Sequence, residues 1–289
     1  ASFGIGSSEQ SNSVAHSNQE SFGIDPMKTE IVLTVFTAIV ILGGIKSIAT
    51  ASSFIVPFMA IFYVAGGLII IFMHLDLLAP AFATIFRDAF SGEAVAGGAI
   101  GTVIRYGVAR GVFSNEAGMG SAPIAAAAAK TDHPVRQALV SMTGTFLDTI
   151  VVCSITGLVL VMGGIYTNGE TGAALTTQTF NLLLPGPGGW IVTIGLVFFA
   201  YSTILGWCYY GEKCASYLLG EWFVLPYRII YVASVMVGTI ASLDLVWAAA
   251  DTFNGLMAVP NLIALVLLSG VIVKETRDFI AKRKSGELP

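Results

Sequence analysis

The segment 111–130, GVFSNEAGMGSAPIAAAAAK, carries residue types that can bind a small ion or a polar molecule inside an apolar protein. An apolar helical run reaches the polar triplet 114–116, passes Gly118 and Gly120, and resumes near Pro123 in a run of alanines. Glycine allows backbone angles that a helix does not use. Proline is tolerated in the first turn of a helix, where its missing N–H has no partner to lose. The segment therefore predicts a helix that breaks and restarts.

Such a break is suited to binding charged groups. Carbonyls that leave the helix can coordinate a cation, and the N-terminus of the second half-helix, with Ser121 as its N-cap, can face a carboxylate. Glu116 is a functional candidate because an ionisable side chain at membrane depth is costly. Asn115 is either an oxygen ligand or a lock on the break. The alternative is a surface loop with Asn115 and Glu116 solvated, and the position of Lys130 beyond the second half-helix argues against it.

A second polar group lies in residues 199–207, FAYSTILGW. Ser202 and Thr203 follow Phe199 by three and four positions, so both hydroxyls and the Phe199 carbonyl converge on one helix face. These oxygens suit a small hard cation. Alternatively, both hydroxyls donate to the carbonyl one turn earlier, as is common in apolar helices. Trp207, one turn beyond, is either the wall of a small pocket or a member of an interfacial tryptophan belt.

Two further polar positions have a functional and a structural interpretation. Gln10 lies in the polar cluster EQSNS, where it either contacts a ligand or hydrogen-bonds a neighbouring helix. Glu9 and Asn12 are weaker candidates there. Asp148, in GTFLDTIVV, has either a functional role or a structural ion pair with Arg105 or Arg110.

Other polar residues indicate local structure rather than a site. Asp251, in AAADTFNG, is expected to cap a helix, and His133 with Pro134 to begin one. The histidines lack metal-ligand spacing, the three cysteines form no CxxC pair, and no GxSxG, HExxH, Walker or dinucleotide motif is present. We therefore expect no enzyme, no metal centre and no cofactor.

The composition indicates the class of protein to which these residues belong. The 289 residues are 55% hydrophobic and 11% charged, with a mean hydropathy of +0.80. An ordinary soluble domain carries roughly 25% charged residues. The net charge of −4 leaves no electrostatic footprint for nucleic acid. The sequence therefore predicts an all-α polytopic membrane protein, and its 32 glycines are typical of closely packed membrane helices.

A spanning helix needs about 20 mainly apolar residues. We expect one partial span at the start of the chain and seven complete ones, with an amphipathic interfacial segment at 76–92. The partial span is 1–17, and the complete ones are 27–47, 52–75, 96–130, 134–163, 187–217, 223–243 and 246–273.

The positions of the basic residues test these spans, because successive loops must alternate between the two sides of the membrane. With the C-terminus in the cytoplasm, ten of the 14 Lys and Arg residues fall on the cytoplasmic side, whereas Lys28 and Arg87 fall outside and Arg105 and Arg110 lie within a span. This agrees with the positive-inside rule. The ten are Lys46, Lys130, Arg136, Lys213, Arg228, Lys274, Arg277, Lys282, Arg283 and Lys284.

Three long motifs carry a family resemblance: SNEAGMGSAPIAAAAAKTDHPVRQ, FGIGSSEQSNSVA and FFAYSTILGWCYYGEKC. The chain strongly resembles the sodium:alanine (alanine/glycine:cation) symporter family over essentially its whole length. The resemblance implies a single transporter domain with the leucine-transporter-type fold of two inverted five-helix repeats. Residues 1–75 would end the first repeat, 96–273 form the second, and 274–289 form a cytoplasmic tail. In that comparison the chain begins in the third core helix, without the first repeat's broken helix.

The resemblance also implies the function and its residues. It implies symport of a small neutral amino acid, alanine or glycine, with sodium as coupling ion, across the plasma (inner) membrane. A proton-coupled transporter and a cation channel are the alternatives, and the chain carries no oligomerisation signal. The substrate-binding residues would be Gln10, Gly118, Met119, Gly120, Thr203 and Trp207. The cation-binding residues would be Asn115, Phe199, Ser202 and Thr203, with Glu116 and Asp148 as further intramembrane polar groups.

Overall fold

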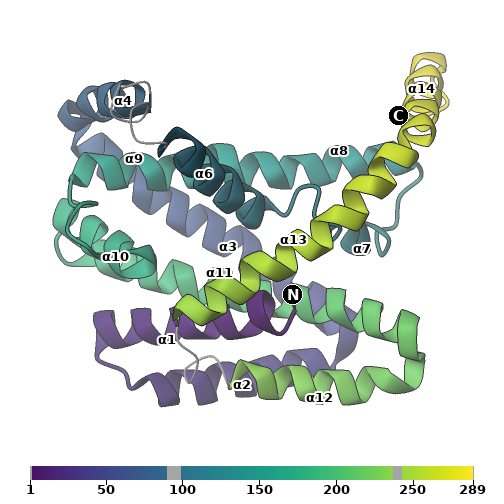
Figure 1. Cartoon of the computed structure of the whole chain (residues 1–289), viewed down its shortest axis with the longest axis horizontal. Helices are drawn as coiled ribbons and strands as arrows, with labels where there is room; N and C mark the ends of the chain where they lie inside the picture. Colours follow the sequence, from purple (N-terminus) through teal and green to yellow (C-terminus); the bar gives the residue numbers. More distant parts are fainter. Residues whose placement is uncertain (1, 90–98, 237–242, 289) are drawn as a thin grey trace. The chain divides into compact units, whose positions relative to one another are not determined.

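The computed structural model describes residues 2–89, 99–236 and 243–288, and the regular structure of these residues is entirely helical (Figure 1). The chain separates into two compact units. The first comprises Ala1–Ile104 with Val151–Ala250, and the second Arg105–Ile150 with Asp251–Pro289. The all-helical class expected from the composition is confirmed for these residues.

The first unit is built around one long helix. α11 (Pro187–Leu219) contacts α1, α2, α3, α10 and α12 within that unit. The elements that surround it are η1 (Gly4–Ser8), α1 (Glu9–Phe22), α2 (Pro26–Leu42), α3 (Gly44–Met73), α4 (Leu75–Ala89), α9 (Ser154–Gly163), α10 (Gly172–Leu183), η3 (Glu221–Phe223) and α12 (Val224–Val235). α10 falls in the 164–186 segment, for which no helix is expected from the sequence.

The junction between α2 and α3 differs from the sequence prediction. The predicted spans 27–47 and 52–75 leave the turn at residues 48–51, whereas the chain turns at Gly43–Gly44, with Gly44 in the left-handed region at φ 73°. The hydroxyl of Thr50 donates to the Lys46 carbonyl, and that of Ser53 to the Thr50 carbonyl. Because the helix itself satisfies these polar side chains, they do not end it.

Helix ends follow local capping chemistry elsewhere. α2 begins as predicted, with the Asp25 carboxylate accepting from the Met27 N–H at 2.9 Å and Pro26 in first position. α1 extends to Phe22, beyond the predicted end at residue 17, because the first left-handed residue is Gly23 at φ 64°.

Glycines let α3 lie close to its neighbours in the first unit. A Cβ atom at Gly66 would lie 2.6 Å from Ile191 Cγ2, and one at Gly67 would lie 2.3 Å from Ile155 Cγ2. Small residues at such positions allow membrane helices to pack backbone to backbone. The apolar core of this unit includes Tyr63, Ile70 and Phe180, and the Tyr63 hydroxyl is hydrogen-bonded to that of Thr156 at 2.8 Å.

The second unit contains the end of α6 (Ala99–Asn115), α7 (Ala122–Ala126), α8 (Pro134–Thr145), most of the π-helical segment η2 (Phe146–Cys153), most of α13 (Leu243–Leu267), and α14 (Ser269–Ser285). α8, η2 and α9 together form the predicted span, 134–163. The predicted span 246–273 is wrong at its end, because α13 stops at Leu267. The predicted tail is helical through Ser285.

Four of the described helices are long and apolar enough to cross a membrane. They are Gly44–Met73, Pro134–Gly163, Pro187–Leu219 and Ala250–Leu267. α2 and the part of α6 before the break have 17 residues each, at the lower limit for a span, and α12 has 12 before residues that the structure does not describe. Helices long and apolar enough to cross a membrane thus lie at four of the seven predicted complete spans, and the other three stay predictions.

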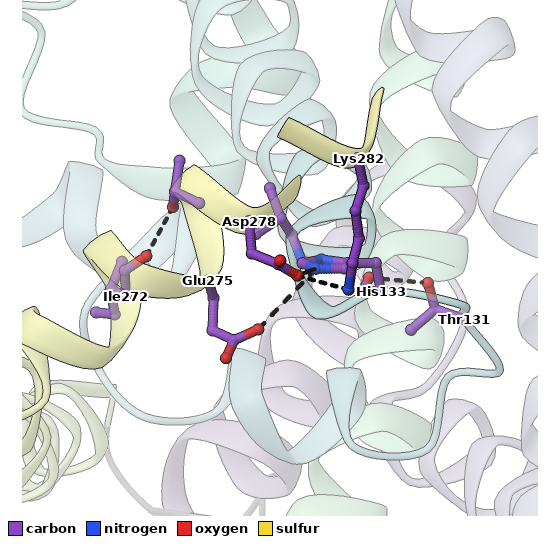
Figure 2. Close-up of polar contacts among 8 residues, drawn as sticks. Thr131, His133, Ile272, Glu275, Asp278 and Lys282 are labelled. Atoms are coloured by element: carbon purple, nitrogen blue, oxygen red, sulfur yellow. Dashed lines mark hydrogen bonds and ion pairs between the residues drawn. The ribbon is translucent and has the colours of Figure 1, made fainter. Parts of the chain in front are cut away.

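His133 joins the start of α8 to α14 within the second unit (Figure 2). Its Nδ1 accepts from the Val135 N–H at 3.2 Å, which confirms the predicted helix start. Its Nε2 lies 3.4 Å from Asp278 Oδ2, and Lys282 Nζ lies 2.8 Å from the same oxygen. The hydrogen bonds from Lys282 and His133 lower the pKa of Asp278.

Candidate functional site

The predicted break in the helix is present. α6 ends at Asn115 and α7 begins at Ala122. Glu116 has a φ of 55°, Gly118 of 80° and Gly120 of 94°. A left-handed conformation is unfavourable for a glutamate, so surrounding contacts must hold it.

Asn115 supplies two of those contacts. Its Oδ1 accepts from the Ala117 N–H at 2.9 Å, and its Nδ2 donates to Thr149 Oγ1 on η2 at 2.9 Å. Farther along the break, Asn261 Nδ2 on α13 donates to the Gly118 carbonyl at 2.8 Å. Of the two roles considered for Asn115, this geometry favours the lock, because both ends of its amide are engaged. Asn261 has no signal in the sequence, since only its tertiary position brings it to the break.

The restart of the helix is confirmed in position but not in its capping. Pro123 lies in the first turn of α7, as predicted. The Ser121 side chain makes no capping bond, because its backbone is already helical at φ −74° and ψ −44°, whereas an N-cap side chain reaches back from an extended backbone. The Ser121 hydroxyl is buried and has no hydrogen-bond partner among the described residues. Met119 is 2% exposed, in keeping with an apolar wall.

Neither of the two predicted partners, Arg105 and Arg110, forms an ion pair with Asp148 in the described part of the chain, and the Arg105 guanidinium lies over the Tyr106 ring. Arg110 Nη2 instead lies 2.6 Å from Asp251 Oδ2. This contact also corrects the expectation for Asp251, which lies inside α13 and caps no helix. Asp148 is half-buried in η2 and accepts from the hydroxyls of Ser114 and Thr149.

The two hydroxyl residues of α11, Ser202 and Thr203, lie in the first unit. Ser202 Oγ and Thr203 Oγ1 each donate to the Phe199 carbonyl at 2.9 Å, which is the helix back-bonding considered above. Each hydroxyl oxygen keeps lone pairs that can face a cation. The sodium assignment for these residues therefore stays a prediction.

Trp207 is buried within the first unit. Its side chain is 3% exposed, and a Cβ atom at Gly6 would lie 2.2 Å from its Cβ. Its ring meets that of Tyr210 edge-on, with centroids 5.7 Å apart. Because an interfacial tryptophan faces lipid, this packing argues against the belt, and the role of pocket wall stays a prediction.

Gln10 lies on α1 beside a buried carboxylate. Its Nε2 donates to Glu9 Oε2, and the Ser13 hydroxyl lies 3.3 Å from Glu9 Oε1. Glu9 is 6% exposed, so this polar cluster is internal to the first unit.

Sequence reasoning missed Tyr231 on α12, which fixes the start of the chain against α11. Its fully buried hydroxyl lies 3.0 Å from the Gly6 carbonyl and 2.8 Å from the Ile204 carbonyl. The contact ties Gly6 to Ile204, which lies one turn before Trp207 on α11, and no spacing of residues in the sequence predicts it.

The predicted site residues fall into two groups, one in each unit. The first unit holds Gln10, Phe199, Ser202, Thr203 and Trp207. The second holds Asn115, Glu116, Gly118, Met119, Gly120 and Asp148, and in it the break lies beside Asp148 through Ser114 and the Asn115–Thr149 contact.

The chain matches known transporters over its whole length. The model of the sodium:alanine symporter family matches residues 1–289. A relative named sodium/alanine symporter AgcS, from Methanococcus maripaludis, is 61% identical over 289 residues, covering 99% of this chain and 64% of its own. An uncharacterised transporter of Haemophilus influenzae is 52% identical, covering 98% of this chain and 64% of its own. Amino-acid carrier protein AlsT of Bacillus subtilis is 36% identical, covering 99% of this chain and 62% of its own. The chain thus spans less than two thirds of the length of these relatives.

Proposed function

The chain belongs to the sodium:alanine symporter family, and from this premise we propose that it acts in sodium-coupled symport of a small neutral amino acid, alanine or glycine. The family is one of transporters, in agreement with the absence of enzyme motifs. The observation that carries the proposal is the helix break, whose left-handed Glu116 and freed backbone lie beside a polar cluster. The 61% identity to a protein named sodium/alanine symporter supports the substrate and the ion.

The mechanism is alternating access. Sodium completes the binding site, the amino acid binds beside it, and one helix bundle rocks against another between outward-open and inward-open states. Coupling requires sodium to bind one state more tightly than the other, since a ligand shifts an equilibrium only through differential affinity. We place the protein in the plasma membrane with the C-terminal α14 in the cytoplasm, because most basic residues then lie inside.

The residues take separate roles in this proposal. The backbone at Gly118, Met119 and Gly120 binds the substrate carboxylate, and Gln10 contacts the substrate. Sodium is bound by the Phe199 carbonyl and the hydroxyls of Ser202 and Thr203. Buried Trp207 limits the substrate side chain to the size of a methyl group.

Alanine uptake by site variants tests these roles. In proteoliposomes with an inward sodium gradient, Thr203→Ala should lower kcat/KM for alanine about tenfold or more, as expected for a lost bond to a charged group. Trp207→Ala should admit larger amino acids such as leucine, because truncation opens the pocket wall. Tyr217→Phe is the control, since Tyr217 lies on the same helix and is 89% exposed. Site variants with the control's kinetics and selectivity would contradict the assignment.

A further inference from the structure

The first unit contains an apolar pocket that none of the residues assigned to sodium or substrate lines. Its volume is about 410 Å³, within the range of about 300–1,000 Å³ that is usual for small-molecule sites. Side chains of α1, α2, α3 and α11 line it, and the lining is almost entirely apolar. Val14 and Leu33 are its buried floor, whereas Val32 and Phe36 are more than half exposed beside them. The pocket is therefore suited to an apolar ligand that enters from the surface of the unit.

The pocket extends from one end of the helices toward their middle. Lys28, in the first turn of α2, lies at its outer end, and Tyr201, near the middle of α11, lies at its inner end. The Phe22 ring at the end of α1 lies 6.2 Å from the Trp190 ring near the start of α11, so these two helix ends lie on the same side. From Lys28 to Phe36, α2 advances about 12 Å at 1.5 Å per residue, close to the roughly 15 Å of hydrocarbon in one leaflet. The lining along α2 thus has the depth of a single leaflet.

Lys28 brings a positive charge to the outer end of the pocket. It forms no ion pair with any residue that the structure describes. A lysine can lay its methylene stem along an apolar surface and keep its ammonium group in the polar layer. Lys28 is one of the two basic residues expected outside, and the other, Arg87, is paired with Asp88. Such a cation beside an apolar pocket is complementary to a molecule with an apolar chain and an anionic head.

Aromatic contacts hold the inner walls of the pocket in place. The Tyr201 hydroxyl donates to the Phe36 carbonyl at 2.9 Å, which joins α11 to α2. The Phe198 ring meets that of Phe58 on α3 edge-on, with centroids 5.2 Å apart. A preorganised pocket loses little conformational entropy when its ligand binds. Because lipid tails are as apolar as the side chains, the choice among lipids depends on the fit of the chain and on the charge of the headgroup.

We propose that this pocket binds one acyl chain of an anionic phospholipid of the outer leaflet, with the lipid phosphate at Lys28. The chain lies along Val32 and Phe36 and ends near Tyr201. In that position the lipid packs against α2 and α11 together and stabilises their contact. The leaflet follows from the proposed orientation of the protein, whereas the site itself is independent of the transported amino acid and ion.

Native mass spectrometry of the intact protein, released from detergent, counts the lipids that it retains. The wild type should retain phosphatidylglycerol in preference to phosphatidylcholine with the same acyl chains. Lys28→Gln should weaken the binding of phosphatidylglycerol about fivefold, as expected for one lysine near an anionic headgroup, and leave that of phosphatidylcholine unchanged. Arg87→Gln is the matched control, because Arg87 is the other basic residue expected outside and does not line the pocket. The control should retain phosphatidylglycerol as the wild type does.

A second variant tests the place of the acyl chain rather than the charge. Val32→Trp puts an indole ring into the pocket and should abolish the retention of phosphatidylglycerol. Val35→Trp is its control, because Val35 lies on the same helix, is 52% exposed and does not line the pocket. Since both valines are exposed, this pair tests the site even if Lys28→Gln fails to fold.

Three results would overturn the lipid site. The first is equal retention of phosphatidylglycerol and phosphatidylcholine by the wild type, which would remove the role of the charge. The second is equal retention of phosphatidylglycerol by Val32→Trp and Val35→Trp, which would place the lipid elsewhere. The third is displacement of phosphatidylglycerol by inorganic phosphate alone, which would show a site for a free anion. Absence of sodium-driven uptake would contradict the proposed function and leave the lipid site standing.

Discussion

At the scale of single residues, the most consequential group is the amide of Asn115. It bonds at the same time to the break, through the Ala117 N–H, and to η2, through Thr149. One side chain therefore holds a backbone conformation that Glu116 does not favour and connects it to the Asp148 cluster. A substitution at this position should therefore lower the stability of the break.

Asn115→Ala should lower the free energy of unfolding by about 1–3 kcal/mol, because it leaves polar partners in the break unsatisfied. Thermal unfolding in detergent measures this loss. Asn168→Ala is the matched control, because Asn168 makes the same contact to the N–H two residues ahead, that of Glu170, in an exposed turn. Equal losses in the two variants would mean that the break does not depend on Asn115.

At the scale of elements, the close approach of η1 to α11 is decisive for the first unit. Gly6 lies against Trp207, and Tyr231 bonds to the carbonyls of both segments. The arrangement places α1, with Gln10, on α11, and it depends on the absence of a side chain at position 6.

Gly6→Ala should destabilise the protein by about 1–3 kcal/mol, because overpacking forces neighbouring side chains and backbone to move. The added Cβ would meet Trp207 Cβ at 2.2 Å. Gly4→Ala is the control, since a Cβ there meets nothing within 4 Å and the residue belongs to the same π-helical segment. Tryptophan fluorescence should shift in the first variant only, and similar spectra in both would contradict the packing.

The contact of α14 with His133 predicts a pH dependence (Figure 2). The pKa of Asp278 is lowered in the folded protein, mainly by the hydrogen bond from Lys282. The ionised Asp278 therefore stabilises the fold above the pKa of an unfolded aspartate, about 4. This stabilisation is lost as the pH falls through the lower pKa of the folded protein. The pKa of Lys282 is raised, mainly by Asp278, so its contribution is lost only as pH rises through a value above its usual range.

Hydrogen-exchange protection of α14, corrected for intrinsic rates, should fall below about pH 4 in the wild type. Asp278→Asn should remove that fall, while Asp76→Asn, on α4 in the other unit, should retain it. An acid-induced loss of protection of the same size in Asp278→Asn would show that α14 is held by other contacts.

At the scale of the whole molecule, the features predicted well from sequence are those with a local physical cause. The break follows from Gly118, Gly120 and Pro123, and the span 134–163 from length and hydropathy. The failures have tertiary causes. The Arg110–Asp251 pair and the Tyr231 contacts join residues far apart in the chain, and α10, a helix that the sequence does not predict, packs against α11.

The central claim is that sodium drives the movement of a small amino acid, and accumulation against a gradient tests it most directly. The intact protein is reconstituted into vesicles that already contain alanine at the external concentration, and labelled alanine is followed with and without an inward sodium gradient. The account predicts accumulation above the external concentration only with the sodium gradient. Equilibration without accumulation, as through a channel, or accumulation driven by a pH gradient alone would contradict it.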